Sequence, residues 1–414
     1  MNPPRVLMVA YHFPPLAGSS GIQRTLRFVQ HLPALGWEPI VLSADVRAYE
    51  RTSPDMDADI PAGTVVRRAF ALDTARHLCI RGRYIGAMAR PDRWVTWRFD
   101  GVRQGLRLVR TYQPDVLWST YPIATAHLIG HALHQRTGLP WIADFRDPMA
   151  QDGYPTDPVT HRQFLRIERD AVESARFSVF TTPGAAAEYR QRYPHCADRI
   201  VVIENGYDEP SFAQAEADEA DRTPLQPGCF TLLHSGIVYP SERDPTQLMA
   251  ALAILAQQGA IRPGSLCVRF RAAVQDDLLM QLAAERGVSD YIEIAPPLPY
   301  RVALQEMLRA DALLAMQASN CNAQIPAKVY EYLRAGRPIV CLSDPAGDTA
   351  GVLREAGVEL HARLDDAQDI ANALKRMLDT DRPLALPRVE AVRRASRAGR
   401  AQAMAELLAR ARRP

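Results

Sequence analysis

Short apolar segments alternate with helical segments along nearly the whole chain, and this alternation runs twice. In the first half the predicted elements are Arg5–Tyr11, Ile22–Leu35, Glu38–Leu42, Gly101–Tyr112, Val116–Ser119, Thr125–Thr137, Trp141–Asp144, Phe164–Ala175, Ser178–Thr181 and Ile200–Ile203. In the second half they are Phe230–Ser235, Pro245–Gln258, Leu266–Ala272, Asp276–Arg286, Ile292–Ala295, Tyr300–Arg309 and Ala312–Met316. Strands that alternate with helices form parallel sheets covered by helices on both faces. The sequence therefore predicts an α/β fold with two doubly wound halves.

The length of the chain supports two domains. A chain of 414 residues exceeds a single hydrophobic core, so two Rossmann-like domains of about 200 residues are expected. The turn signal Glu204–Asp208 and the polar segment Glu209–Gly228 lie between the halves and mark a hinge. We expect an N-terminal domain over residues 1–206, a C-terminal domain over 207–385 and a helical tail over 386–414. The Arg/Ala-rich tail is either a solvated helix or one that packs back on the N-terminal domain.

Composition excludes several classes of function. The net charge of +2 gives no support for a nucleic-acid partner. The chain has no run of about 18 apolar residues, and its first residues lead into a strand pattern rather than a signal peptide, so a cytoplasmic protein is expected. His127, His131 and His134 have helical spacing, but no carboxylate accompanies them on that face. We therefore expect no metal.

Lys328 is one of only two lysines in a chain whose lysines and arginines number 49. It precedes apolar residues at helical spacing, Gly336 ends that predicted helix, and Pro338–Leu342 is typical of a buried strand. A compact ammonium near a helix N-terminus suits a phosphate group. Glu331, one turn further along the same face, is placed to accept hydrogen bonds from a ribose. The alternative is an amphipathic helix with an exposed Lys–Glu pair.

Two glycine-containing loops follow predicted strands. Gly18 and Gly21 follow the first strand, where glycine lets the backbone approach a ligand, but they do not satisfy the G-x-G-x-x-G pattern of NAD sites. A turn without function is the alternative. Gly236 and Arg243 follow Phe230–Ser235, and ligands of open α/β sheets bind beyond the carboxyl ends of strands. Arg243 is therefore a candidate second cation for a diphosphate, or it pairs with a neighbouring carboxylate.

Two further segments carry candidate chemistry. Asp144 and Asp147 flank Arg146 at the end of a predicted strand, where carboxylates orient hydroxyls or take a proton, or form a structural ion pair. Arg76–Arg110 contains nine arginines interleaved with aromatic residues. Such a segment suits an interfacial membrane contact or an anionic acceptor, and a solvated helical face is the alternative.

Together these pieces resemble the GT-B glycosyltransferases similar to glycosyltransferase family 4. The Asp144–Pro148 segment looks like the pattern of a bacterial polysaccharide subgroup in that family. The matching residues span nearly the whole chain in the expected order: Pro14, Pro15, Gly18, Gly21, Asp144–Pro148, Asn205–Asp208, Gly236, Arg243 and Lys328–Val340.

The resemblance implies two Rossmann-like domains facing across a cleft, and transfer of a sugar from a nucleotide-diphosphate sugar with retention of configuration. It implies no metal and no cofactor besides the donor. Glu331 would hold the donor ribose, Arg243 and Lys328 the diphosphate, and Gly18 would admit the donor phosphates. The implied catalytic residues are Asp144, Arg146, Asp147, Arg243 and Lys328, and the implied donor-binding residues are Gly18, Gly236, Arg243, Gln324, Ile325, Lys328 and Glu331.

Two positions depart from the family pattern. Many members carry a Glu eight residues before the ribose-binding Glu, where this chain has Ala323. Many also carry a His after the Trp141–Phe145 strand, where this chain has Arg146 and Asp147. The expected partners are the nucleotide-sugar donor and a glycan, lipid-linked or small-molecule acceptor of bacterial polysaccharide or glycoconjugate biosynthesis. A peripheral contact of Arg76–Arg110 with the cytoplasmic face of a membrane is also expected.

Two other functions stay open from the sequence. A non-hydrolysing sugar-nucleotide epimerase also uses two Rossmann-like halves, although it needs carboxylates and histidines around the sugar that are not evident here. An inactive GT-B partner subunit would fit Ala323, whereas the joint presence of Lys328, Glu331 and Arg243 favours an enzyme.

Overall fold

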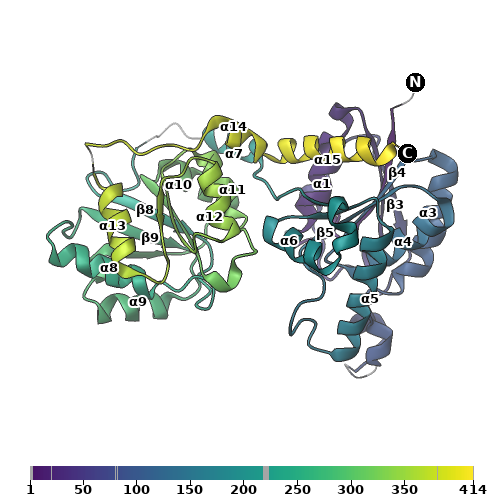
Figure 1. Ribbon diagram of the computed structural model, residues 1–414, viewed down its shortest axis with the longest axis horizontal. Coiled ribbons are helices and arrows are strands. Elements are labelled where there is room, and N and C mark those ends of the chain that lie inside the picture. The colour runs from purple at the N-terminus through teal and green to yellow at the C-terminus, as the bar shows by residue number, and fades with distance from the viewer. Residues whose placement is uncertain are drawn as a thin grey trace. The chain divides into compact units, whose positions relative to one another are not determined.

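The computed structural model describes residues 3–19, 21–79, 81, 83–217, 223–379 and 381–413. It divides into two compact units (Figure 1). The first unit combines Met1–Asn205 with Arg397–Pro414, and the second is Gly206–Ser396. The helical tail is broken: α14 (Val389–Arg394) belongs to the second unit and α15 (Arg397–Arg412) to the first.

The first unit is built on a parallel sheet of seven strands in the order β3-β2-β1-β4-β5-β6-β7. The strands are β1 Arg5–Val9, β2 Glu38–Ala44, β3 Val65–Ala69, β4 Val116–Thr120, β5 Trp141–Arg146, β6 Phe177–Phe180 and β7 Ile200–Val202. The α-helices besides α15 are α1 Gly21–His31, α2 Thr74–His77, α3 Trp97–Tyr112, α4 Ala124–Thr137, α5 Pro158–Ser174 and α6 Pro183–Arg192. Short 3-10 helices are η1 Pro33–Leu35, η2 Val46–Ala48, η3 Pro54–Met56, η4 Gly86–Ala89 and η5 Pro194–Arg199.

Both faces of this sheet are buried. Successive side chains of a strand point to opposite faces, and in β1 Leu7 packs in one hydrophobic cluster whereas Met8 packs in the other. The cluster around Met8 also contains Met404 and Leu408 of α15. The helix α15 therefore covers part of the sheet of the first unit, which contains the first strand of the chain.

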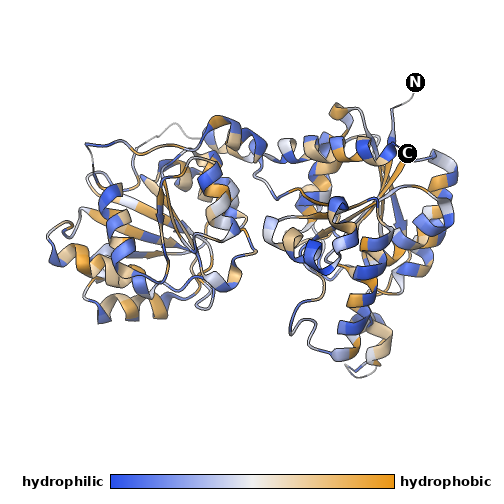
Figure 2. Ribbon diagram, viewed as in Figure 1, coloured by the Kyte–Doolittle hydropathy of each residue, from blue (hydrophilic) through white to orange (hydrophobic). Residues whose placement is uncertain are grey.

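The second unit is built on a parallel sheet of six strands in the order β10-β9-β8-β11-β12-β13. The strands are β8 Phe230–Ser235, β9 Leu266–Arg271, β10 Ile292–Ala295, β11 Ala312–Gln317, β12 Ile339–Ser343 and β13 Leu360–Ala362. The α-helices besides α14 are α7 Glu209–Ala217, α8 Thr246–Gln257, α9 Asp276–Glu285, α10 Tyr300–Arg309, α11 Lys328–Ala335, α12 Asp348–Glu355 and α13 Ala367–Met377, with 3-10 helices η6 Ser289–Tyr291 and η7 Ser319–Cys321. Figure 2 shows apolar strands inside each unit and polar residues on the outer helix faces.

The predicted α/β class with two Rossmann-like, doubly wound sheets is confirmed. One expectation is wrong in detail, because α7 occupies the start of the segment predicted to be a polar linker; residues 218–222 of that segment lie outside the described part. Asp208 accepts hydrogen bonds from the backbone N–H (3.3 Å) and hydroxyl of Ser211, and Phe212 is buried. A side-chain cap and tertiary burial thus form a helix that the apolar pattern does not indicate.

The order of the strands locates the ligand-binding edges. In the first sheet the order reverses between β1 and β4, and in the second it reverses between β8 and β11. Helices on either side of such a switch point leave a crevice at the carboxyl ends of the strands. The loops after β1 and β8 therefore lie at the ligand-binding edges of the two sheets. Among the described residues, no helix combines the length and hydropathy that a membrane crossing requires.

Candidate active site

Lys328 and His234 meet at the switch point of the second sheet. His234 lies near the end of β8, and Lys328 is the first residue of α11. The His234 ring donates from Nδ1 to the Leu314 carbonyl of β11 at 3.0 Å. Its Nε2 is then an acceptor, and Lys328 Nζ lies 3.1 Å from it. The histidine therefore holds the lysine side chain at the edge where β8 and β11 end.

Electrostatics set the charges of this pair. Burial, followed by the nearby Arg243, lowers the pKa of Lys328 to about 7, and Glu331 opposes the shift. Burial and then the Lys328 charge hold the pKa of His234 well below its usual range. His234 is therefore neutral, and Lys328 is poised between its charged and neutral forms near neutral pH. An anion beside Lys328 would favour the ammonium form.

Gly236 brings the loop after β8 close to Lys328. Its φ of +113° belongs to a region that side chains with a Cβ rarely adopt, and a Cβ there would lie 3.2 Å from Lys328 Nζ. Its backbone N–H donates to the Arg271 carbonyl at 2.8 Å, which fixes the loop. A glycine at this position leaves the space beside the lysine open.

Arg243 and Gln317 carry unused hydrogen-bonding capacity. The Arg243 side chain is 11% exposed, lies over the Tyr239 ring at 5.1 Å, and its Nε is buried without a partner among the described residues. Gln317, the last residue of β11, is 2% exposed, and both amide atoms of its side chain lack a partner in the same part of the chain. The Ala318 N–H donates to the Glu242 carbonyl at 2.7 Å, so Gln317 and Arg243 lie at one sheet edge. Buried polar groups normally find partners, so a polar ligand is expected here.

The remaining predicted residues of this unit lie around α11. Glu331 is in its first turn and accepts a hydrogen bond from the Tyr300 hydroxyl at 2.8 Å. Gln324 and Ile325 lie in the loop that precedes α11. The Gln324 carbonyl accepts from Thr349 Oγ1 at 3.0 Å, and Ile325 packs against a hydrophobic cluster. Ala323 is exposed in the same loop.

A second cluster forms at the switch point of the first sheet. His12 follows β1, Gly21 begins α1, and Arg146 ends β5. A Cβ on Gly21 would overlap His12 Nδ1 and lie 2.9 Å from an Arg146 terminal nitrogen. Arg146 has a φ of 63°, and its Nε is buried with no partner among the described residues. Burial and then the Arg146 charge lower the pKa of His12 to about 4. A neutral imidazole and a guanidinium thus lie beside a helix N-terminus, an arrangement that attracts anions.

The three charged residues predicted together at the end of β5 have different surroundings. Asp144 is fully buried and accepts from Arg24 Nε at 2.8 Å, from Arg24 Nη2 at 2.9 Å and from Thr120 Oγ1 at 3.1 Å. Asp147 is exposed and accepts from Thr181 Oγ1 at 3.4 Å. The register of β5 against β6 shifts between Asp144 and Arg146. Asp147 and Arg146 are therefore available to a ligand, whereas Asp144 is engaged in a buried ion pair.

Two other predicted features have local explanations. Gly18 is exposed with a φ of +78°, and a Cβ there would meet nothing within 4 Å, so backbone conformation is its requirement. His127 contacts Ser119 Oγ at 2.8 Å, and His134 Nδ1 donates to the Leu139 carbonyl at 2.8 Å. Within the described part of the chain, no three potential metal ligands gather.

Sequence reasoning assigned no role to His12, Arg24, His234 or Gln317. Two of them carried a usable signal. Gln317 is a polar residue that ends an apolar strand, and His234 stands two residues before the predicted Gly236. No local pattern pairs Arg24 with a carboxylate 120 residues further along the chain.

Comparisons with known proteins show that this chain is similar to glycosyltransferases. The family model for the glycosyl transferase 4-like domain matches residues 20–206. The chain is 26% identical over 311 residues to the D-inositol 3-phosphate glycosyltransferase of Thermobispora bispora, covering 71% of this chain and 70% of that protein. It is 25% identical over 289 residues to the protein of the same name in Streptosporangium roseum, covering 66% and 64%.

Solved structures share the architecture. Anabaena Alr3699/HepE in complex with UDP superposes with a TM-score of 0.59 at 13% identity, covering 99% of this chain and 97% of that chain. The α,α-trehalose 6-phosphate synthase of Burkholderia multivorans superposes with a TM-score of 0.63 at 14% identity, covering 98% and 96%. At these identities the likeness establishes a common fold.

Proposed function

We propose that this chain, a glycosyltransferase of the GT-B fold similar to glycosyltransferase family 4, binds a nucleotide-diphosphate sugar in its second unit and transfers the sugar with retention. The observation that carries the proposal is the group of Lys328, Arg243 and Gln317 at the carboxyl ends of β8 and β11. Two cations and an unpartnered amide at a switch point match a diphosphate and its sugar. Support comes from Anabaena Alr3699/HepE, which was solved with UDP and with UDP-glucose.

Each donor group has a proposed partner. The diphosphate lies against Lys328 and Arg243, in the space that Gly236 leaves open. Glu331 accepts hydroxyl hydrogens of the ribose, and the Tyr300 hydroxyl bonded to it at 2.8 Å holds the carboxylate in place. The loop of Gln324 and Ile325 lines the same site, in which Ala323 contributes no carboxylate toward the sugar.

The chemistry follows from where charge develops. When the bond between sugar and diphosphate breaks, positive charge grows on the sugar ring and negative charge on the leaving diphosphate. Fixed cations beside the leaving group stabilise that transition state more than the ground state. Lys328 adds to this stabilisation, because anion binding shifts a lysine whose pKa is about 7 towards its charged form. The second unit thus acts mainly on the leaving group.

The first unit is proposed to hold the acceptor. Arg146 and the exposed Asp147 orient its hydroxyl groups, and the loop of Gly18 lets the backbone approach a ligand. Asp144, whose oxygens are engaged by Arg24, supports this loop rather than touching substrate. The acceptor is a glycan, a lipid-linked saccharide or a small molecule of bacterial polysaccharide or glycoconjugate biosynthesis. A phosphorylated small molecule is supported by the two relatives named for D-inositol 3-phosphate.

A peripheral membrane contact through Arg76–Arg110 completes the proposal. Within this segment Tyr84, Ile85 and Met88 are 41%, 69% and 41% exposed, and basic residues flank them. Residues 80 and 82 of the segment lie outside the described part of the chain. Binding of the purified protein to anionic liposomes at low salt tests the contact, and indifference to them would remove it.

Calorimetric binding of UDP, GDP, ADP and dTDP tests the donor site. Wild type should bind one nucleotide tightly, and Glu331→Ala should weaken that binding at least tenfold, since a hydrogen-bonded charged group contributes about 1.5–3 kcal/mol. Glu355→Ala, which removes an exposed carboxylate of α12, is the matched control. Absence of binding by all four nucleotides would contradict the donor site. Nucleotide-sugar turnover that is independent of any acceptor would favour an epimerase.

A further inference from the structure

A pocket of about 390 Å³ opens on the first unit between α3, α4 and α5. Apolar side chains that include Val95, Leu128 and Ile167 line part of it, and Arg90, Arg98, Arg166, His131, Gln163 and Asp170 supply polar groups. None of its lining residues belongs to the donor or acceptor groups proposed above, so the transferase chemistry does not use the pocket. Four of them, Arg90, Pro91, Val95 and Arg98, lie within the Arg76–Arg110 segment proposed for the membrane contact.

The charges around the pocket are unbalanced. Three guanidinium groups line it with one carboxylate, Asp170, whose distance of 3.8 Å from Arg166 makes a loose pair. Arg90 is paired outside the lining, with Asp157 at 3.1 Å. The backbone N–H of Arg98 donates to the Val95 carbonyl at 3.1 Å, whereas its guanidinium has no hydrogen-bond or ion-pair partner among the described residues. Burial lowers the pKa of His131, so the imidazole adds no charge at neutral pH. A guanidinium without a counter-ion beside a cavity is suited to an anion.

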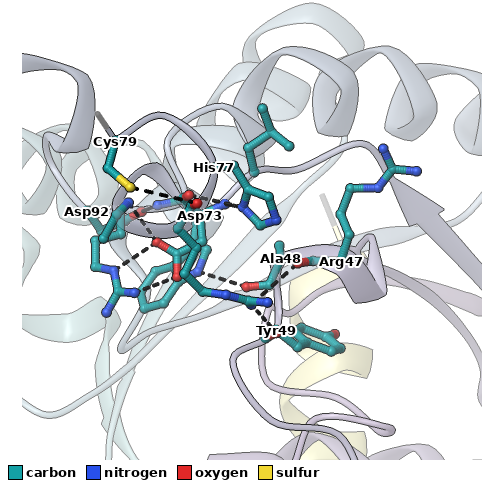
Figure 3. A network of polar contacts seen from close by, with 12 residues as sticks. Arg47, Ala48, Tyr49, Asp73, His77, Cys79 and Asp92 are labelled. Carbon is teal, nitrogen blue, oxygen red and sulfur yellow. Dashed lines mark hydrogen bonds and ion pairs between the residues drawn. The ribbon is translucent and has the colours of Figure 1, made fainter. Parts of the chain in front are cut away.

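The pocket wall is fixed in place before any ligand binds. Figure 3 shows a polar network that includes Asp73 and Asp92, and Asp92 lies in the segment that carries Arg90 and Arg98. Asp73 is fully buried and accepts from Arg93 Nε at 2.9 Å. Asp92 accepts from the backbone N–H groups of Trp94 and Thr125, at 3.0 and 2.8 Å. The second contact ties the segment to α4, so a ligand would meet a preorganised site.

Gln163 adds a requirement for a hydrogen-bond donor. Its side-chain carbonyl oxygen is buried and has no donor among the described residues. An unpartnered buried acceptor is costly, whereas a ligand hydroxyl would satisfy it. An anion alone would neutralise the arginines. An anion with a neighbouring hydroxyl would also donate a hydrogen bond to the Gln163 oxygen.

We propose that this pocket binds a phosphate ester that carries a neighbouring hydroxyl, with Arg98 and Arg166 on the phosphate and Gln163 on the hydroxyl. Phosphate oxygens match the forked donors of arginine. Such a group occurs in soluble polyol phosphates and in lipid headgroups. Phe99, Ile85 and Leu165 are 77%, 69% and 38% exposed, and Phe99 and Leu165 adjoin the pocket arginines in sequence.

The test measures binding of glycerol 3-phosphate and inorganic phosphate by calorimetry. Sedimentation with phosphatidylcholine vesicles, with and without phosphatidylglycerol, provides the lipid arm. The full chain carries Lys328→Ala in every sample, so that phosphate at the proposed donor site does not contribute. Arg98→Gln removes an exposed charge that the fold does not use, and Arg107→Gln removes an exposed charge of the same helix outside the pocket.

Arg98→Gln should weaken binding about tenfold or more, whereas Arg107→Gln should leave it unchanged. Glycerol 3-phosphate should bind more tightly than inorganic phosphate, and Gln163→Leu should abolish that preference. Binding of glycerol 3-phosphate identifies a soluble source, and binding only of phosphatidylglycerol vesicles identifies a headgroup. Equal losses in Arg98→Gln and Arg107→Gln, or no binding in either arm, would overturn the proposal.

Discussion

Replacing Asp144 with asparagine tests whether this carboxylate holds the first unit together. Asp144 is fully buried, and Arg24, whose side chain is 5% exposed, donates to both of its oxygens at 2.8 and 2.9 Å. The substitution keeps the shape of the side chain but leaves the guanidinium in a buried site without its counter-ion. Breaking a buried pair by removing one partner costs about 3–5 kcal/mol. The free energy of unfolding of the first unit should fall by about that amount.

The distribution of tryptophans makes this measurement specific. All five tryptophans lie in the first unit, at positions 37, 94, 97, 118 and 141. Tryptophan fluorescence during urea unfolding therefore reports on that unit alone. With a denaturant slope of about 3 kcal/mol per molar urea, the midpoint should fall by about 1–2 M. Asp147→Asn is the matched control, because Asp147 is exposed and its change should cost about 0.5 kcal/mol or less.

Two results would refute the reasoning. Equal midpoints for Asp144→Asn and Asp147→Asn would show that the buried pair contributes little to stability. An unchanged midpoint together with lost turnover would make Asp144 a chemical participant instead. Arg24→Gln should destabilise the unit as Asp144→Asn does, and the double variant should lose less than the sum, because the two residues form one pair.

Four further predictions concern the two switch points. Donor affinity should fall as pH rises through about 7, since the pKa of Lys328 is lowered to about 7 and only its charged form attracts a diphosphate. Titration calorimetry at several pH values should show this fall in affinity for wild type. The Lys328→Met variant should not show it. Lys328→Met should also lower kcat by about 10²–10³-fold, and wild-type turnover would remove Lys328 from the mechanism. Gly236→Ala should add about 1–3 kcal/mol of backbone strain at a φ of +113° and push Lys328 aside, which should weaken nucleotide binding. Nucleotide binding at wild-type strength would contradict this. Gly351→Ala, where a Cβ meets open space, is the control. His12, with its pKa lowered to about 4 by burial and then Arg146, should stay neutral at pH 6 by NMR, and Arg146→Gln should raise that pKa.

Much of the fold follows from local patterns. Apolar runs such as Phe230–Ser235 give β8 with the predicted bounds, and Gly336 ends α11 in the left-handed conformation that favours glycine. The same patterns miss β3, whose Arg67 and Arg68 interrupt the apolar run, although it pairs with β2 along its length. Tertiary pairing there forms a strand that its own residues do not indicate.

The candidate site likewise combines residues that local sequence patterns predict with contacts that only the structure reveals. Lys328, Gly236 and Arg243 are recognisable because each follows a strand or opens a helix, and parallel topology gathers such positions at one edge. The partner of Lys328 depends instead on the His234 tautomer, which the Leu314 carbonyl of the adjacent strand fixes. The orientation of Arg146 depends on a positive φ at a non-glycine residue and on a shift of strand register. Contacts across strands and strained backbone carry no local sequence pattern, so only the structure reveals them.

The placement of α15 on the first unit has a consequence for how the protein is made. Residues 397–412 supply Met404 and Leu408 to the hydrophobic cluster around Met8 and Trp118. The ribosome must synthesise the whole second unit, about 190 residues, before these side chains exist. At about 5–20 residues per second this takes on the order of 10–40 s. During that interval part of one apolar face of the first sheet lacks its cover, and the nascent chain is a natural client for chaperones that bind exposed hydrophobic surface.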